Sequence, residues 1–126
     1  MNLNQITIPS INVKRSAEFY KNLGLQLIVE SIPRYVRFLC PDGNSTFSVH
    51  SVDKKISTNG ILIYFECAQL DQTVELLKDK GIEFTQDPKD QSWLWREARL
   101  SDPDGNQLCL FYAGENRINP PWRIKH

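Results

Sequence analysis

The sequence predicts an α+β fold built from two copies of a βαβββ unit. Two Pro-Asp-Gly-Asn turns, at residues 41–44 and 103–106, each stand between two strand-like runs. Gly24 and Gly81 each follow a stretch with helical periodicity. The same order of elements therefore occurs twice, and two copies are needed because one such unit cannot bury its own sheet.

The first copy begins with an alternating strand at residues 5–8. A helix at residues 16–23 follows, with Asn12 as its N-terminal cap and Gly24, which takes a left-handed backbone cheaply, as its C-terminal cap. Three strands come next, at residues 25–30, 35–40 and 46–52. The first Pro-Asp-Gly-Asn sequence is a strong turn signal between the last two of them.

The second copy repeats this order. A strand is expected at residues 61–66, and Leu70, Val74 and Leu77 mark one face of a helix that Gly81 caps. Three further strands are expected at residues 82–86, 93–100 and 107–112. The second copy is longer than the first, and we place its extra residues in a loop at residues 87–92.

Length and composition limit the class of protein. A chain of 126 residues predicts a single domain, with module one at about 1–56, module two at about 57–113 and an extended tail at 114–126. The apolar share of 40% excludes general disorder, and no apolar run approaches the ~20 residues of a membrane span. The first ten residues lack the basic start and apolar stretch of a signal peptide.

Charge and cysteine content point to a cytoplasmic protein that binds neither nucleic acid nor membrane. Fifteen basic residues balance fifteen acidic ones, so no global field recruits a polyanion. Cys40, Cys67 and Cys109 are widely spaced and form no CxxC pair, which argues against a disulfide framework or a structural zinc site. Cys109 lies in an apolar strand and is expected to be a small buried side chain rather than a nucleophile.

Taken together, these motifs resemble the vicinal oxygen chelate superfamily, which includes glyoxalase I, extradiol dioxygenases, fosfomycin-resistance enzymes and bleomycin-binding proteins. The resemblance rests on the opening strand, the SAEFYKNLGL helix and the SDPDGN turn, in that order, and covers residues 1 to about 113. It implies that the two modules form a curved mixed sheet around a cavity, with the helices outside. It also implies a small-molecule ligand and a homodimer.

Strand alternation assigns the side chains to two faces of the expected sheet. The helix-side core is expected to contain Ile6, Ile8, Val36, Phe38, Phe47, Val49, Ile61, Ile63, Phe65, Ala98, Leu100, Leu108 and Leu110. The ligand-binding cavity is expected to be lined by Gln5, Thr7, Tyr35, Arg37, Ser48, His50, Leu62, Tyr64, Trp95, Glu97, Arg99, Cys109 and Phe111. This mixture suits an organic ligand with a polar or anionic group, although the same pattern also fits a sheet face open to solvent.

The expected metal positions do not favour a metal. Metal-dependent members of the superfamily hold one divalent ion through His and Glu ligands on four strands, and the ion polarises substrate oxygens. By resemblance, these positions fall on Gln5, on Ser48 or His50, on Leu62 and on Cys109. Leucine cannot bind a metal and glutamine is a weak ligand, so at most two positions keep a plausible donor. An atypical divalent-metal site formed by His50, Glu97 and Cys109 stays open.

Three functions remain open at this stage. The leading one is metal-free binding of a small organic molecule, by sequestration or sensing. The second is a lyase or dioxygenase that uses an atypical metal site, or Glu97 as a general base. The third is a structural or interaction subunit whose cavity is vestigial.

The remaining aromatic residues have two interpretations each. The tail, with Pro120, Pro121 and Trp122, is expected to be extended and to dock on the domain, across the cavity mouth or over a sheet edge. Trp93 and Trp95 are expected on one face of one strand, where they would stack on a flat ligand or form a dimer contact.

Overall fold

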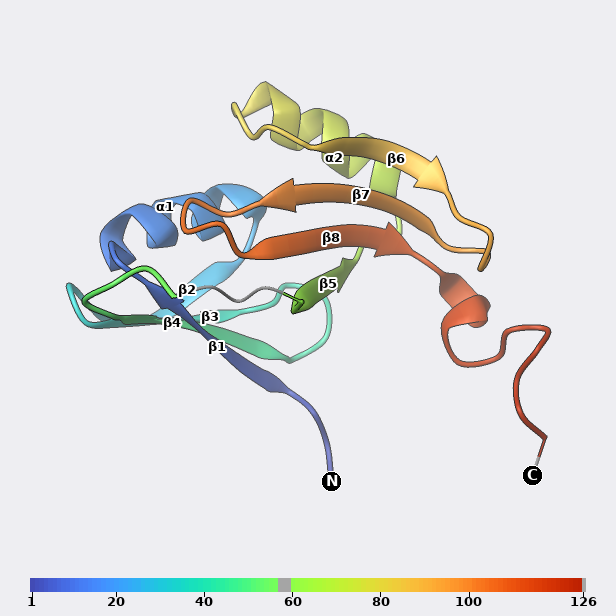
Figure 1. The fold of residues 1–126 in the computed structure, drawn as a ribbon, viewed down its shortest axis with the longest axis horizontal. Helices are drawn as coiled ribbons and strands as arrows, with labels where there is room; N and C mark the ends of the chain where they lie inside the picture. The colour runs from blue at the N-terminus through green and yellow to red at the C-terminus, as the bar shows by residue number, and fades with distance from the viewer. Residues whose placement is uncertain (57–59, 126) are drawn as a thin grey trace. The chain divides into compact units, whose positions relative to one another are not determined.

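The computed structural model describes residues 1–56 and 60–125 and has the predicted α+β architecture of two βαβββ modules (Figure 1). Hydrogen bonding divides the expected curved sheet into two mixed sheets of four strands each. The chain also divides into two compact units: unit 1 comprises residues 1–60 and 102–106, and unit 2 comprises residues 61–101 and 107–126. The expected boundary between the modules, after residue 56, adjoins residues 57–59, which lie outside the described residues. The last residue of the expected tail, 126, lies outside them as well.

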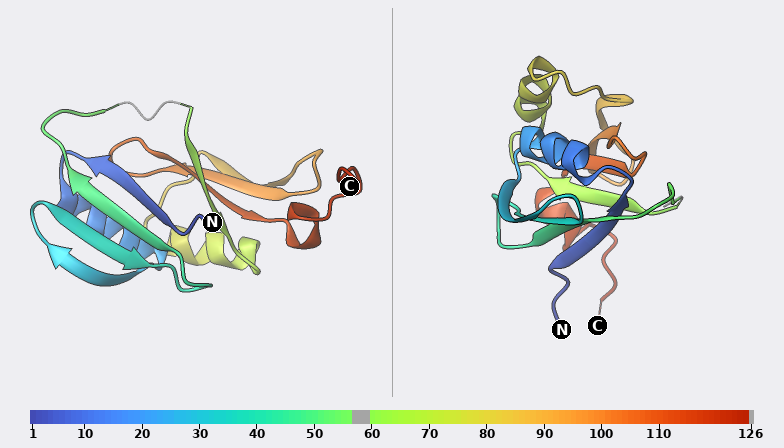
Figure 2. Two further views of the ribbon diagram at one scale, coloured as in Figure 1. Left: turned by 90° about the horizontal axis from the view of Figure 1, so that it is seen from below. Right: turned by 90° about the vertical axis from the view of Figure 1, so that its left-hand side faces the viewer.

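Unit 1 contains the first module. Its elements are β1 (Gln5–Ser10), α1 (Val13–Leu23), β2 (Gln26–Ser31), β3 (Tyr35–Leu39) and β4 (Thr46–Ser51). The strands lie in the order β1-β4-β3-β2, with β1 parallel to β4 and the other neighbours antiparallel. α1 packs against β3 and β4 on one face of this sheet (Figure 2).

Both predicted caps of α1 are confirmed. The Asn12 side chain accepts a hydrogen bond from the Arg15 amide at 3.1 Å, and Gly24 has the left-handed backbone, with φ at 112°. The helix begins at Val13, earlier than expected, because it starts directly after its capping residue. Its buried face includes Tyr20, whose ring lies 4.6 Å from that of Phe47 on β4.

Unit 2 contains most of the second module and the tail. Its elements are β5 (Leu62–Glu66), α2 (Leu70–Asp79), β6 (Gln86–Asp90), β7 (Arg96–Ser101), β8 (Gln107–Tyr112) and the 3₁₀ helix η1 (Gly114–Arg117). The strands lie in the order β5-β8-β7-β6, the same topology as in unit 1. Among the described residues of both units, no helix is long and apolar enough to cross a bilayer.

Two sequence-based expectations in unit 2 are wrong. The strand expected at residues 82–86 is β6, which runs from Gln86 to Asp90 and so occupies most of the stretch assigned to an inserted loop. β6 is an edge strand with mainly exposed polar side chains, and an edge tolerates Pro88; its composition therefore resembles that of a loop. By contrast, Gly81 ends α2 as expected: directly after Lys80 it has a left-handed φ of 90°, its amide donates to the Lys78 carbonyl at 2.9 Å, and the Ile82 amide donates to the Leu77 carbonyl at 3.1 Å.

The second error concerns the tryptophans. β7 begins at Arg96, so Trp93 and Trp95 lie in the connection between β6 and β7 and not on one strand. Leu94, between them, has a φ of 69°, in the left-handed region. The backbone reverses there, and strand alternation cannot place the two rings on a common face.

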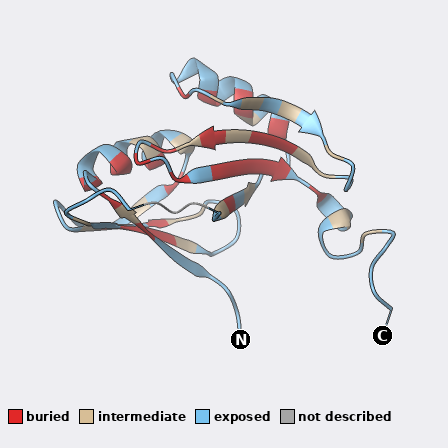
Figure 3. Ribbon diagram, viewed as in Figure 1, coloured by how far each residue is buried: buried red, intermediate tan, exposed pale blue. Residues whose placement is uncertain are grey.

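The predicted core is largely confirmed. Val36, Phe38, Phe47 and Val49 are buried in unit 1, as are Ala98, Leu100, Leu108 and Leu110 in unit 2. The exceptions lie at edges and ends: Ile6, on edge strand β1, is 37% exposed, Ile61, before β5, is 61% exposed, and Phe65 is half-buried. Buried residues run along both faces of β8, because Cys109 and Phe111 are buried as well (Figure 3).

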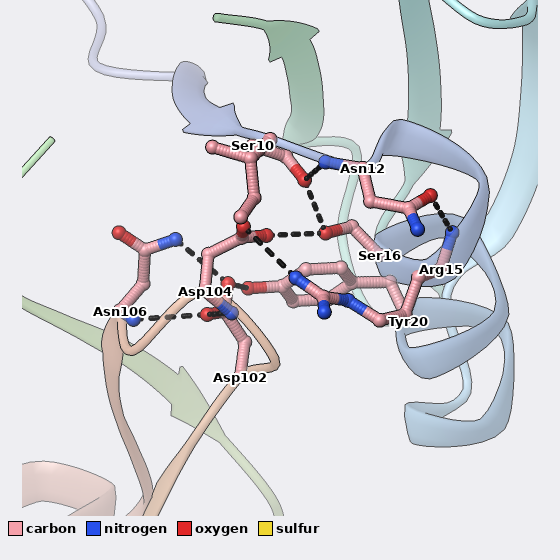
Figure 4. Close-up of polar contacts among 9 residues, drawn as sticks. Ser10, Asn12, Arg15, Ser16, Tyr20, Asp102, Asp104 and Asn106 are labelled. Carbon is pink, nitrogen blue, oxygen red and sulfur yellow. Dashed lines mark hydrogen bonds and ion pairs between the residues drawn. The ribbon is translucent and has the colours of Figure 1, made fainter. Parts of the chain in front are cut away.

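A buried carboxylate organises the loop at residues 102–106, which belongs to unit 1 (Figure 4). One oxygen of Asp102 accepts from the Tyr20 hydroxyl at 2.6 Å and from the Asn106 side chain at 2.8 Å. The other accepts from the backbone amides of Asp104 and Asn106, both at 2.9 Å. Four hydrogen bonds thus compensate for the removal of this charge from water.

Asp104 joins the same loop to the start of α1. Its carboxylate accepts from the Ser16 hydroxyl at 2.7 Å, from the Ile11 amide at 3.1 Å and from Arg15 at 3.3 Å. Burial alone would raise the pKa of Asp104, but hydrogen bonds from Ser10, Ser16 and Ile11 together with the Arg15 charge lower it below its usual value. The SDPDGN sequence is therefore an anchor for α1 as well as a turn.

We predict that Tyr20→Phe lowers the free energy of unfolding by about 1.5–3 kcal/mol, the usual range for a hydrogen bond to a charged group. The variant removes the hydroxyl that Asp102 accepts from and leaves the ring packing in place. Chemical denaturation measures the loss, with Tyr112→Phe as the matched control because Tyr112 is exposed. Equal unfolding midpoints for the two variants would contradict the importance of this bond.

We predict that Asp104→Asn destabilises the protein most above about pH 4 and progressively less below it. The folded pKa of Asp104 is lowered, so its stabilising contribution is complete above the unfolded pKa and is lost as the pH falls through the folded value. Unfolding free energies of wild type and variant, measured from about pH 6 downward, should converge at low pH. A difference that stays constant across this range would show that the carboxylate charge is unimportant.

Candidate functional site

The structure gathers most of the predicted site residues into two groups, one on each sheet. We call the unit 2 group the aromatic–carboxylate face; it comprises Leu62, Tyr64, Trp93, Trp95, Glu97, Arg99, Cys109 and Phe111. We call the unit 1 group the polar face; it comprises Gln5, Thr7, Tyr35, Arg37, Thr46 and Ser48.

Glu97 is the charged centre of the aromatic–carboxylate face. It lies on β7 and is fully buried. One carboxylate oxygen accepts from Arg99 Nη2 at 2.8 Å, and the other accepts from the Trp93 indole N–H at 2.9 Å. The carboxylate in turn raises the pKa of Arg99, against the opposing effect of burial. This is a buried acid whose two oxygens both have donors, one of them cationic.

Glu97 does not use every N–H group of the Arg99 guanidinium. Its Nη2 is engaged by Glu97, but its Nε is buried and has no hydrogen-bond partner within the described residues. Buried donors are normally paired, so an unpaired one is a feature of interest in a candidate site.

Three aromatic rings lie beside this ion pair. Trp95 stacks on Phe111, with ring centroids 4.8 Å apart and planes 24° apart. Tyr64 meets both rings edge-on, at 5.8 Å from Trp95 and 5.4 Å from Phe111. Phe111 is buried, whereas Tyr64 is 42% exposed. The cluster therefore offers an aromatic surface to solvent at Tyr64 and a packed support beneath it.

The chain after β8 holds Trp95 in place. The Trp95 indole N–H donates to the Asn116 carbonyl at 3.3 Å, and Glu66 accepts from the amides of Ala113 and Gly114 at 2.8 and 3.0 Å. The start of the tail is therefore docked on unit 2 as expected, but it forms the 3₁₀ helix η1 instead of an extended strand. Trp122 is 58% exposed.

Cys109 lies in the core of unit 2. It is fully buried, and burial together with the negative charge of Glu97 raises the pKa of its thiol to about 12. A thiol with so high a pKa is a poor nucleophile near neutral pH. Leu62 packs against the cluster formed by Cys109, Phe111 and Ala113.

On the polar face, a chain of hydrogen bonds crosses three strands. Gln5 on β1 accepts from Thr46 through its side-chain oxygen and donates through Nε2 to Ser48 Oγ on β4 at 2.8 Å. Ser48 Oγ lies 2.6 Å from the Tyr35 hydroxyl on β3, which accepts from Arg37 Nε at 2.9 Å. Strand alternation correctly predicted that these residues share a face.

Exposure rises along that chain, from buried Ser48 through half-buried Tyr35 to exposed Arg37. Burial would raise the pKa of Tyr35, but hydrogen bonds with Ser48 and Arg37 lower it overall. His50, the strand partner of Tyr35 in β4, is exposed at the end of the row, and exposed Thr7 accepts from Gln5 at 3.2 Å.

The positions expected to bind a metal do not provide a suitable set of ligands. The Gln5 amide is engaged by Thr46 and Ser48, Leu62 has no donor atom, and Cys109 is fully buried in an apolar cluster. Across the described ranges 1–56 and 60–125, no group of three or more His, Cys, Asp or Glu side chains could hold an ion. These residues therefore do not fit the site of the metal-dependent members.

Two contacts of the site were not predicted from the sequence. The Trp93–Glu97 hydrogen bond depends on the hairpin connection, which was assigned to a strand. The Asn116 carbonyl that holds Trp95 belongs to a 3₁₀ turn with no periodic signal in the sequence.

Comparison with known proteins agrees with this architecture. The family model for the Glyoxalase/Bleomycin resistance protein/Dioxygenase superfamily matches residues 2–110. No curated protein shows significant similarity to the chain.

Solved structures show the same fold at low sequence identity. A glyoxalase/bleomycin resistance protein/dioxygenase from Nocardioides is 20% identical, with a TM-score of 0.78 over 99% of this chain and 90% of that one. A lactoylglutathione lyase from Agrobacterium tumefaciens is 13% identical, with a TM-score of 0.75 over 94% and 96% of the two chains. A bleomycin-binding protein in complex with bleomycin is 20% identical, with a TM-score of 0.71 over 89% and 98%.

The repeated βαβββ topology and the match over residues 2–110 lead to one conclusion: this chain belongs to the Glyoxalase/Bleomycin resistance protein/Dioxygenase superfamily.

Proposed function

We propose that this protein binds a small organic molecule without a metal ion, and that the molecule docks on the aromatic–carboxylate face of unit 2. The observation that carries this proposal is the exposed Tyr64 ring above the Trp95–Phe111 stack, next to a buried and fully paired carboxylate. Binding sites for small molecules commonly combine an apolar or aromatic lining with a few fixed polar groups.

The chemistry of this face defines the ligand class. A flat ring gains contact by stacking on or against Tyr64 and Trp95, whose positions are fixed by packing and by the Asn116 carbonyl. The partly exposed guanidinium of Arg99 supplies a hydrogen-bond donor for a polar substituent, while Glu97 offsets its charge. These features support a planar aromatic or heteroaromatic ligand with a polar group.

Two further considerations support a metal-free role. The expected metal positions lack suitable donors, so the Lewis-acid chemistry of metal-dependent members has no matching ligand set here. A structural neighbour is described as a bleomycin-binding protein in complex with bleomycin. Binding of an organic molecule by this fold therefore has a precedent.

An enzymatic role is the second candidate, and it rests on Glu97. A buried carboxylate beside an aromatic surface is a possible general base once a substrate is bound. Both of its oxygens already accept hydrogen bonds, so a substrate would have to displace Arg99 or Trp93 to reach it. This requirement makes simple binding the better-supported function.

The proposal also covers the cellular compartment and the oligomeric state of the protein. Within the described residues, Cys40, Cys67 and Cys109 form no disulfide, which suits a reducing compartment such as the cytoplasm. We also infer a homodimer, because Ile118, Trp122 and Ile124 in the tail are exposed apolar side chains of the kind that interfaces bury.

We predict that 2-naphthol, a flat bicyclic probe, binds to unit 2 and that Tyr64→Ala raises its Kd about tenfold. The matched control is Tyr112→Ala, because Tyr112 is a similarly exposed tyrosine at the end of β8. Isothermal titration calorimetry measures both Kd values. Absence of binding, or equal Kd values for the two variants, would contradict the proposed docking surface.

We also predict that untagged protein contains no stoichiometric metal and shows no thermal stabilisation by Ni²⁺, Zn²⁺, Mn²⁺ or Fe²⁺. The reason is the donor set, in which the Gln5 amide is already hydrogen-bonded, Leu62 is a hydrocarbon and Cys109 is buried in an apolar cluster. Elemental analysis and thermal denaturation with each ion provide the measurements. About one ion per chain, lost in Gln5→Ala or His50→Ala, would instead support a lyase or dioxygenase.

A further inference from the structure

The polar face of unit 1 contains a hydrogen-bond chain whose direction can be worked out from one end. Gln5 Nε2 lies 3.1 Å from the Ile6 carbonyl oxygen, which can only accept. The nitrogen and not the oxygen of the amide must therefore point that way. The two protons of Nε2 face three acceptors, Ile6 O, Thr7 Oγ1 at 3.2 Å and Ser48 Oγ at 2.8 Å, and Ser48 Oγ is the nearest. Gln5 therefore donates to Ser48 Oγ, while its own oxygen accepts from Thr46.

At the other end of the hydrogen-bond chain, the cationic Arg37 fixes the direction of the bond. Arg37 Nε can only donate, and it does so to the Tyr35 hydroxyl oxygen at 2.9 Å. Between these two donors stand the hydroxyls of Ser48 and Tyr35, which share a single hydrogen bond of 2.6 Å. That bond uses one of their two protons. One of the two hydroxyl protons is therefore left without an acceptor among the side chains of this hydrogen-bond chain.

Burial decides which hydroxyl keeps that proton. Ser48 is fully buried, and among the described residues its Oγ contacts only Gln5 Nε2 and the Tyr35 hydroxyl. A spare proton there would be an unpaired buried donor, which folded proteins avoid. Tyr35 is half-buried and can direct its proton outward. Ser48 therefore donates to Tyr35, and the outward-pointing donor is the Tyr35 hydroxyl.

We propose that the Tyr35 hydroxyl and the Arg37 guanidinium form an oxyanion-binding subsite on unit 1, which accepts a carboxylate of a small organic acid. The two groups are joined by the Arg37 Nε hydrogen bond, so they are held side by side. Arg37 is exposed, and within the described part of the chain it makes no ion pair with Asp or Glu. Its remaining N–H groups and the phenol proton can thus point to one anionic oxygen group.

The subsite is expected to distinguish an anionic ligand from a neutral one. A carboxylate accepts from both the phenol and the guanidinium and neutralises Arg37. The carbonyl oxygen of a neutral amide of the same shape accepts more weakly and does not neutralise Arg37. The lowered pKa of Tyr35 strengthens its phenol as a donor and has the same origin, the hydrogen bonds from Ser48 and Arg37 that outweigh burial. This subsite lies on the polar face and does not depend on the docking surface proposed for unit 2.

The test compares benzoate with benzamide, its neutral analogue, by two-dimensional NMR of labelled protein. Benzoate is expected to shift the amide signals of residues 35–37 and 48 and the Arg37 side-chain signal, in a saturable way. Benzamide is expected to leave these signals in place. Equal shifts with both probes, or none with benzoate, would overturn the subsite.

Variants separate a binding role from a structural one. Arg37→Gln should raise the benzoate Kd at least tenfold and Tyr35→Phe about threefold to tenfold, with Tyr112→Phe unchanged as the matched control. The amide spectrum away from β3 and β4 reports whether each variant is folded. A folded Tyr35→Phe with the Kd of wild type would exclude the phenol as a ligand group. Shifts at Tyr64 and Trp95 are read separately, so failure of the unit 2 proposal and failure of this one are distinguishable.

Discussion

The buried carboxylate of Asp102 is the interaction on which the arrangement of unit 1 depends. It accepts four hydrogen bonds, one of them from Tyr20 in the buried face of α1. Asp104 adds contacts to Ser16 and to the amide of Ile11, at the start of the same helix. Unit 1 is therefore completed by five residues, 102–106, that the chain contributes from its second module. An uncompensated charge at this depth would be costly, so the loop and the helix have to form together.

The same constraint shapes the candidate site in unit 2. Glu97 is fully buried and tolerated there because Arg99 and the Trp93 indole satisfy its two oxygens. Of the three aromatic rings beside this ion pair, Phe111 is buried and Trp95 is held by the Asn116 carbonyl, so Tyr64 presents the most exposed ring. Polar groups held rigid beside an aromatic platform favour recognition of a ligand over chemistry on it, because the carboxylate is already occupied.

Local signals in the sequence predicted much of the fold. Asn12 and Gly24 bracket α1 because capping depends on neighbouring residues alone, and alternation placed Gln5, Ser48, Tyr35 and Arg37 on a common face. β6 was misplaced because an edge strand needs no apolar alternation. The Tyr20–Asp102 and Trp93–Glu97 hydrogen bonds were not predicted, since the first joins residues far apart in the chain and the second depends on the conformation of the hairpin connection, and neither leaves a periodic trace.

The most direct test of ligand binding is a crystal structure of the untagged protein soaked with 2-naphthol. Our interpretation predicts electron density for a flat ring in contact with Tyr64 and Trp95, with its hydroxyl directed toward Arg99. Density for the ring at any other place, with Tyr64 and Trp95 left uncovered, would contradict the assignment of the aromatic–carboxylate face as the binding site.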